Sequence, residues 1–417
     1  MTPNVSVPGP RTPRAPTTRR RRAAAAGIAV SALAALFAAT APTAGAHAQA
    51  GPAVTAAGAG AHAQAARPVG PRLQAIMDRA VRARGSGIPG VALYVRLPGH
   101  RTWSGAAGKA SLHPATPMRA GDRFRAGSIA KTFVAAATLQ LVEEGKFGLD
   151  DPLTAVLPAS VTARFPGAEA ITVRMLLNHT SGLPEWDDAA FDRGVAAHPH
   201  RRWTVGEFLD RAAAMPRTSA PGERFAYNNT DYNLLGLVIE QATGKSWRTV
   251  VRTQVLEPLH LKHTSLPRPG AVPAGRDIAH GYQRVGDKLY DFTDIDSSMA
   301  GAAGGHALLT STEDLSRFLR AVLGGRLFHK PETLAAMRTF VTTPNEHGRV
   351  GYGLGLERYV MPGGVEIVGH MGTTGGYRAF MFHLPAQDID LAMVTNSPAD
   401  PSPVLFPALQ VLLAAAS

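Results

Sequence analysis

A serine and a lysine three residues apart are the first side chains in this sequence that could carry out chemistry. Ser128 and Lys131 occur in the segment FRAGSIAK, at the start of an apolar run. If that run is a helix, positions three apart share one face, so the hydroxyl and the amine can meet. A serine hydroxyl needs a neighbouring base to act as a nucleophile, and burial favours the neutral form of a lysine. The pair is a candidate nucleophile and base, although Ser-x-x-Lys alone is a common combination.

A second polar group lies in the segment YNNTD, just before another apolar run. The hydroxyl of Tyr227 could relay a proton to a leaving group, and the amide of Asn229 could hold a substrate carbonyl. The same segment is also a good helix start, so an ordinary structural role stays open.

A third group is the segment GHMGT at residues 369–373, at the end of a predicted strand. Glycine in a strand lets another backbone approach closely, here that of a substrate. The backbone N–H of Thr373, paired with that of Ser128, could form an oxyanion hole. A simple strand-ending turn is the alternative.

Both ends of the chain are predicted to build one sheet that positions these groups. Helical spacing of apolar residues predicts a helix from about Pro71, followed by an antiparallel hairpin of two strands. Three strands and a last helix are predicted near the C-terminus, and the middle of the chain, 131–309, is mainly helical. The expected elements are strands 91–97, 101–105, 365–370, 377–384 and 389–395, and helices 173–177, 205–213, 232–242, 247–255 and 403–413.

This order of elements predicts an α/β (α+β) fold, in which a mostly helical lobe interrupts an antiparallel sheet. A cleft between two such lobes is a common place for a binding site.

The N-terminus has the composition of a targeting segment. Four consecutive arginines, Arg19 to Arg22, precede an apolar run from Ala23 to about Ala41, and small residues follow up to Ala50. This order predicts a cleavable signal peptide over residues 1–50 and a secreted protein. An uncleaved membrane anchor is the alternative, and the route of export stays open. The Ala/Gly/Pro-rich residues 51–70 are predicted to be a flexible linker, and 71–417 the folded domain.

Charge and cysteine content narrow the class of protein. The formal charge is +12, but six arginines lie in the first fifty residues, which contain no acid, so the remainder carries +6. No basic helix or aromatic-interleaved patch suggests nucleic-acid binding. The chain has no cysteine, which excludes disulfides, a cysteine nucleophile and thiolate metal sites.

Taken in this order, the three groups resemble the motifs of the penicillin-recognising serine enzymes. The Tyr-x-Asn and His-x-Gly forms point to the branch that holds soluble D-alanyl-D-alanine carboxypeptidases, class C β-lactamases and related esterases. The resemblance extends to the segments LQLVEEGKFGLD, LLNHTSGLP, STEDL and GYGLGL. The sequence around the serine is most similar to that of the secreted carboxypeptidases. The resemblance implies a central antiparallel sheet flanked by helices, with a helical second lobe.

The resemblance also implies a role for each site residue. Ser128 would be acylated, Lys131 would be the general base or part of its network, and Tyr227 would relay protons. The substrate would be bound by Asn229, His370, Gly372 and Thr373. No metal or organic cofactor is expected. His179, in the LLNHTSG stretch, is expected to be structural. The expected partners are a peptidoglycan peptide or another small acyl substrate, and β-lactams as covalent ligands, with no nucleic acid and no membrane span after cleavage.

Two departures from the pattern affect substrate binding. Relatives often have Thr or Ser where this chain has Met371, and that hydroxyl helps to bind a substrate carboxylate. An arginine directly follows GYGLGL in the closest pattern, whereas Glu357 stands there and Arg358 comes one residue later. A shift of one residue on a strand turns a side chain to the other face. Arg378 could replace that arginine as the partner of the carboxylate, but the sequence does not show in which direction its side chain points.

The leading hypothesis is a secreted serine-type D-alanyl-D-alanine carboxypeptidase that acts on peptidoglycan stem peptides through an acyl-enzyme on Ser128. An esterase, a D-aminopeptidase or a β-lactamase of the same fold is the nearest alternative. A non-catalytic penicillin or cell-wall sensor or scaffold is an alternative of another class, which Ser128-dependent turnover of any acyl substrate would exclude.

Overall fold

The computed structural model describes residues 68–416, apart from 272–274, 286–287 and 362. The predicted signal peptide and most of the predicted linker lie outside the described residues. Helix α2 (Val69–Arg82) begins two residues earlier than the predicted domain start at residue 71, inside the predicted linker. Among the described residues, no helix is both long enough and apolar enough to cross a bilayer.

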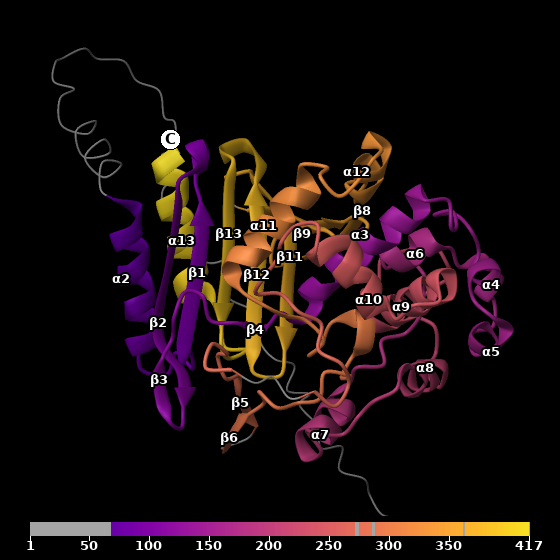
Figure 1. The fold of residues 1–417 in the computed structure, drawn as a ribbon, viewed down its shortest axis with the longest axis horizontal. Helices are drawn as coiled ribbons and strands as arrows, with labels where there is room; N and C mark the ends of the chain where they lie inside the picture. The colour runs from indigo at the N-terminus through magenta and orange to yellow at the C-terminus, as the bar shows by residue number, and fades with distance from the viewer. Residues whose placement is uncertain (1–67, 272–274, 286–287, 362, 417) are drawn as a thin grey trace, which may run out of the picture.

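One antiparallel sheet of nine strands forms the centre of the molecule (Figure 1), in the order β3-β2-β1-β13-β12-β11-β10-β9-β8. Strand β1, near the N-terminus, pairs directly with β13, near the C-terminus. The predicted sheet assembled from both chain ends is therefore confirmed. Its strands are β1 (Gly90–Arg96), β2 (Thr102–Leu112), β3 (Ala115–Pro117), β8 (Val341–Glu346), β9 (Arg349–Tyr352), β10 (Glu357–Met361), β11 (Val365–Thr374), β12 (Tyr377–Leu384) and β13 (Ile389–Thr395).

Four of these strands, β3, β8, β9 and β10, were not predicted. They are short, and their sequences contain proline, glycine and charged residues, which are depleted in strands. They are formed by pairing with strands next to them in the chain, β3 with β2, and β8, β9 and β10 in succession up to β11. The described chain also holds two small two-stranded sheets: β4 (Phe124–Arg125) with β7 (Leu309–Thr310), and β5 (Tyr282–Val285) with β6 (Lys288–Asp291).

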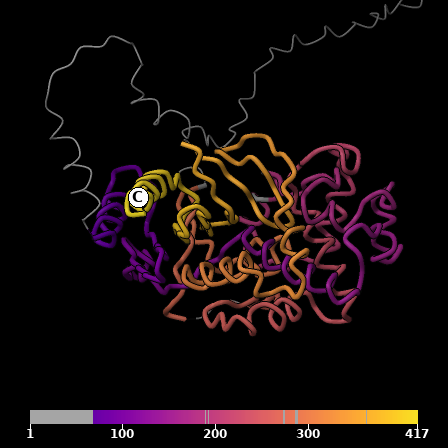
Figure 2. The backbone as a smooth tube through the Cα atoms, turned by 90° about the horizontal axis from the view of Figure 1, so that it is seen from above, coloured from indigo at the N-terminus to yellow at the C-terminus, as the bar shows by residue number. Residues whose placement is uncertain are grey.

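Helices cover both faces of the sheet (Figure 2). Helix α2 and the last helix, α13, share one apolar cluster with one face of the sheet. Helices α3 and α11 and the helices of the middle segment share the larger cluster with the other face. The helices are α3 (Ala130–Glu143), α4 (Leu153–Val156), α5 (Ala159–Thr162), α6 (Val173–Leu177), α7 (Ala189–Ala197), α8 (Val205–Ala213), α9 (Asn229–Thr243), α10 (Trp247–Val251), α11 (Thr312–Leu323), α12 (Pro331–Met337) and α13 (Ser402–Ala416).

The predicted helices 173–177 and 205–213 match α6 and α8, and 232–242 lies inside α9. The predicted helix 247–255 changes at Arg252 into a wider turn of π geometry. Strand β11 alternates its side chains between the two apolar clusters, with Ile367 in one and Val368 in the other.

Candidate active site

Ser128 lies in a short 3₁₀ turn, Gly127–Ile129, that leads directly into α3. Gly127 has a φ of 57°, a left-handed conformation that favours glycine. A Cβ atom there would also lie 2.9 Å from the Thr373 carbonyl oxygen. The turn is therefore pressed against β11, and the serine side chain stays partly exposed beside that strand.

Lys131, the second residue of α3, is buried, with 0% of its surface exposed. Its Nζ lies 3.1 Å from Ser128 Oγ and 2.7 Å from both Asn229 Oδ1 and the Ala303 carbonyl oxygen. An amide oxygen and a carbonyl oxygen only accept hydrogen bonds, so they take the two N–H groups of the neutral amine. The lone pair is then left for the Ser128 hydroxyl, which is the geometry a base requires.

The charge state of Lys131 is set by two opposing effects. Burial lowers its pKa to about 7, and nearby carboxylates, Glu185 first and Asp187 next, oppose that shift. Near neutral pH a large fraction of the amine is unprotonated and can accept the serine proton.

Tyr227 contacts both members of this pair. It forms a side-chain hydrogen bond with Ser128, and Lys131 Nζ lies 4.8 Å from the centre of its ring. Burial raises the pKa of the phenol well above its usual value. The group therefore stays a neutral hydroxyl, which can accept one proton while it donates another.

Asn229 begins helix α9, and its neighbour Asn228 caps that helix by accepting a hydrogen bond from the Asp231 N–H. The side-chain oxygen of Asn229 accepts from Lys131, and its backbone N–H donates to Glu185 Oε2 at 2.8 Å. Asn229 lines the cavity beside Ser128, where it was predicted to contact substrate. It also positions the lysine.

Gly372 brings β11 against the serine turn. A Cβ atom at this position would lie 2.0 Å from the Ala126 carbonyl oxygen and 3.0 Å from the Ser128 nitrogen, so only glycine fits. This close approach places the next residue, Thr373, beside the turn, and its exposed side chain lines the cavity with Ser128. The backbone N–H groups of Ser128 and Thr373 both belong to this junction, and a pair of such donors is the arrangement that stabilises an oxyanion.

The position of His370 differs from the predicted substrate contact. The residue is buried, and its Nε2 lies 3.0 Å from the Tyr352 hydroxyl while Nδ1 lies 2.5 Å from the Met371 carbonyl oxygen. It is not among the residues that line the cavity. Because the cavity-lining surface of β11 begins only at Thr373, His370 belongs to the floor beneath the site.

Glu357, which stands where an arginine was expected, is buried beneath the same strand. It accepts hydrogen bonds from the Met371 N–H at 2.8 Å, the Tyr359 hydroxyl at 2.7 Å and Arg349 at 3.3 Å. This carboxylate holds β10 against β11. The side chain of Met371 packs on the opposite face of the sheet, in the cluster of α2 and α13.

The two arginines left open by the sequence have different surroundings. Arg358 donates two hydrogen bonds to Glu366, at 3.0 and 2.7 Å, and does not line the cavity. Arg378 lies directly opposite Thr373 in the pairing of β11 with β12, so the two side chains share a face. It lines the cavity that contains Ser128.

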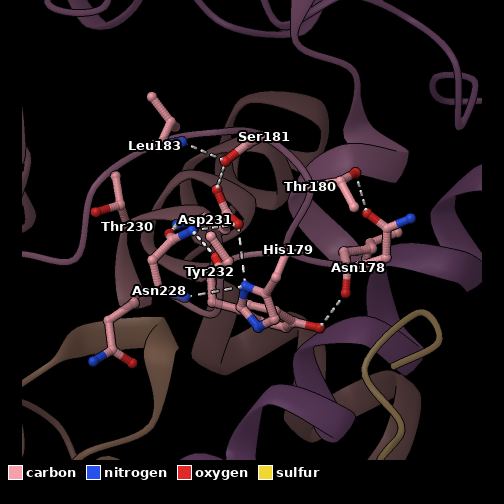
Figure 3. Close-up of polar contacts among 12 residues, drawn as sticks. Asn178, His179, Thr180, Ser181, Leu183, Asn228, Thr230, Asp231 and Tyr232 are labelled. Atoms are coloured by element: carbon pink, nitrogen blue, oxygen red, sulfur yellow. Dashed lines mark hydrogen bonds and ion pairs between the residues drawn. The ribbon is translucent and has the colours of Figure 1, made fainter. Parts of the chain in front are cut away.

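A buried polar cluster supports the site from behind (Figure 3). His179 Nδ1 lies 3.1 Å from Asp231 Oδ2, and Asp231 also accepts hydrogen bonds from Ser181 and Asn228. The His179 ring centre is 4.4 Å from that of Tyr227. The predicted structural role of His179 fits these contacts, since it packs against the tyrosine from a fully buried position.

Sequence reasoning missed the acidic residues of the site. Glu185 and Asp187 follow the LLNHTSGLP segment, and Asp187 lines the cavity with Ser128 and Asn229. Their only signal in the sequence was their closeness to that segment. The cavity has a volume of about 1030 Å³, with Asp187 on the wall of the helical lobe and Arg378 on the wall of the sheet.

The rate of acylation is expected to rise with pH through about 7, as Lys131 loses its proton. Glu185→Gln removes a negative charge that favours the ammonium form, so the pKa of Lys131 falls and the acidic limb of the kcat/KM profile moves to lower pH. Glu313→Gln, at an exposed position of α11, is the matched control and should leave the profile unchanged. A shift of the Glu185→Gln profile to higher pH would contradict this account of the lysine.

The fold and this arrangement of serine, lysine, tyrosine and backbone N–H groups define a serine hydrolase site. Residues 77–416 match the family model described as Beta-lactamase, so the chain belongs to the Beta-lactamase family of serine hydrolases. The family resemblance and the fold expected from the motifs are both confirmed.

Three known proteins show the range of this family. The chain is 29% identical to Esterase EstB of Burkholderia gladioli over 78% of this chain and 90% of the esterase. It is 28% identical to Penicillin-binding protein 4 of Amycolatopsis lactamdurans, over 74% and 81%. The crystal structure of a D-stereospecific amidohydrolase from Streptomyces sp. superposes with a TM-score of 0.72 and 32% identity, over 81% of this chain and 98% of that one.

Proposed function

We propose that this protein is a secreted serine-type D-alanyl-D-alanine carboxypeptidase. The observation that carries the proposal is the position of Arg378, on the cavity wall directly opposite Thr373 and in the same cavity as Ser128. A guanidinium pairs well with a carboxylate, and the leaving residue of such a peptide ends in one. Arg378 would therefore supply the carboxylate partner that Glu357 and Met371 cannot provide.

The residues of the site divide the reaction between them. Ser128 Oγ attacks the carbonyl of the penultimate D-alanine while Lys131 takes its proton, and the N–H groups of Thr373 and Ser128 stabilise the oxyanion. Tyr227 passes a proton to the departing amine as the C–N bond breaks. Water then cleaves the ester on Ser128, and the serine regains its proton.

Secretion and β-lactam binding are part of this proposal. Secretion rests on the order of charged, apolar and small residues in 1–50. The likeness to a relative named Penicillin-binding protein 4 supports β-lactams as covalent ligands of Ser128. Incubation with excess penicillin should add the mass of the drug to the wild-type protein and not to Ser128→Ala.

The test measures D-alanine release from an N-acylated peptide ending in D-Ala-D-Ala. Wild-type protein should release D-alanine and Ser128→Ala should not. Arg378→Gln should raise KM by about 10- to 100-fold, because it removes one charged hydrogen-bonding partner of the carboxylate. Arg358→Gln, outside the cavity, is the matched control. Release that is equal for Arg378→Gln and Arg358→Gln would remove the basis of the proposal.

A second function is favoured by Asp187 on the opposite wall of the cavity. A carboxylate beside Ser128 and Asn229 can pair with a free ammonium group on the acyl part of a substrate, as in an amide of a D-amino acid. The likeness to a D-stereospecific amidohydrolase supports this alternative. Hydrolysis of D-phenylalanine amide, with loss of activity on N-acetylation of the substrate and on Asp187→Asn, would favour it over the carboxypeptidase.

A further inference from the structure

A short loop, residues 299–305, forms one wall of the cavity and also holds the base. Ala300 lines the cavity, and the Ala303 carbonyl oxygen accepts the hydrogen bond from Lys131 Nζ at 2.7 Å. This oxygen belongs to the backbone, so its direction depends on the path of the loop. A change in that path would move the oxygen away from the amine.

The loop turns at a residue in a strained conformation. Ala300 has a φ of 62° and a ψ of 0°, in the left-handed region, where a Cβ atom is unfavourable. Its carbonyl oxygen accepts a hydrogen bond from the Ala303 N–H at 3.0 Å, in the 3₁₀ turn Gly301–Ala303. The conformation of Ala300 therefore helps to set the direction of the Ala303 carbonyl. A residue other than glycine stays in this region only where surrounding contacts hold it.

Asn233 of α9 makes one of these contacts. It follows Asn229 by four residues, so the two asparagines lie on one face of the helix, and its side chain is buried. The amide is oriented so that both of its neighbours are satisfied. Its nitrogen donates to the Ala300 carbonyl oxygen at 2.8 Å, and its oxygen accepts from Trp186 Nε1 at 3.1 Å. The Ala300 oxygen has two lone pairs, so it can accept from Asn233 and from Ala303 together.

Trp186 connects Asn233 to the acidic side of the site. Its side chain is fully buried. The residues before and after it are Glu185, which accepts the Asn229 N–H, and Asp187, which lines the cavity. One buried amide therefore joins the loop that carries an acceptor for the base to the segment that carries the two carboxylates.

We propose that Asn233 is a positioning residue for the base. It holds Ala300 in the left-handed conformation that directs the Ala303 carbonyl to the amine of Lys131. The inference rests on the acylation of Ser128 in the proposed function, whichever acyl substrate is used. A purely structural asparagine would stabilise the fold through the same two hydrogen bonds, but its loss would not change the base. The acylation rate and its pH dependence separate the two roles.

The test uses Asn233→Leu, which keeps a side chain of similar size and removes both hydrogen bonds. The rate constant for acylation by p-nitrophenyl acetate should fall about tenfold, because the strain at Ala300 is no longer compensated in the native path of the loop. The acidic limb of its pH profile, set by the pKa of Lys131 at about 7, should move to lower pH. The lost carbonyl contact stabilises the ammonium form more than the neutral amine.

The matched control is Asn396→Leu, which removes another buried asparagine. Asn396 donates hydrogen bonds to the carbonyl oxygens of Lys109 and His280, at 3.0 and 2.9 Å. The loss of these bonds should lower the thermal midpoint. The pH profile of acylation should stay that of wild type, because the base keeps its contacts.

A second substitution separates positioning from stability. Glycine adopts the left-handed conformation without strain, so Asn233→Leu combined with Ala300→Gly should recover most of the acylation rate. The thermal midpoint should not return to that of wild type, because Trp186 Nε1 still lacks its acceptor. Ala300→Gly alone is the reference for this comparison.

Each result separates the inference from the function beneath it. Equal rates and pH profiles for Asn233→Leu and Asn396→Leu would overturn the inference, and so would a double variant as slow as Asn233→Leu. Both results would leave the proposed function standing, since Ser128 would still be acylated. If neither the ester nor a β-lactam acylates wild-type protein, the proposed function fails and the inference with it.

Discussion

Lys131→Met is expected to lower kcat/KM for every acyl substrate by about 10²- to 10⁴-fold, the range usual for loss of a general base. Methionine keeps the length of the side chain but cannot accept the proton of Ser128, whose Oγ lies 3.1 Å from Nζ in the native site. The loss should appear in acylation, measured as the rate of mass increase on incubation with a β-lactam or an activated ester.

The control for this substitution is Lys109→Met, at an exposed position of β2, which should leave the rate unchanged. The folded state of Lys131→Met is checked by its thermal midpoint, which should not fall sharply, because a buried amine is replaced by an apolar group of similar length. Acylation within tenfold of wild type, with an unchanged pH profile, would show that another group is the base.

Gly372→Ala is expected to reduce kcat/KM by about 10²- to 10³-fold, as for removal of one oxyanion donor. The added methyl group would lie 2.0 Å from the Ala126 carbonyl oxygen, so β11 and the serine turn must separate. Thr373 moves with the strand, and its N–H no longer pairs with that of Ser128. The loss should fall on kcat rather than KM, because the contact strengthens only as charge develops on the oxygen.

Gly121→Ala is the matched control, since a Cβ atom at that glycine meets nothing within 4 Å. A steady-state comparison of the two variants with the same ester substrate is sufficient, together with thermal midpoints. If Gly372→Ala keeps its secondary structure and retains full kcat, the junction of β11 with the serine turn is not the oxyanion site.

The nucleophile and its base were predictable because the chemistry is local. Ser128 and Lys131 are three residues apart on one helix, and helical geometry alone brings such residues together. The strands 377–384 and 389–395 were also predictable to the residue, because each is a mainly apolar run bounded by turns.

The rest of the site depends on contacts between distant segments. The Ala303 carbonyl that holds Lys131 has no side-chain signal in the sequence, and it reaches the lysine only through the fold. In the sequence, Glu357 only departed from the expected arginine after GYGLGL. Its structural role became visible from the pairing of β10 with β11, which places its carboxylate within hydrogen-bond distance of the Met371 N–H. The direction of Arg378 required the register of β12, which no local pattern fixes.

The pairing of β1 with β13 has a consequence for how the protein acquires its structure. Val91 lies opposite Thr395, so the middle of the sheet joins segments that are almost the full domain apart along the chain. Contacts of such high sequence separation require a large loop to close, and they slow folding. The N-terminal hairpin emerges first during synthesis and has no lasting partner until the last strands follow. The contact between Gly127 of the serine turn and Thr373 of β11 joins segments almost as far apart, so we expect the reactive serine to reach its final surroundings late in folding.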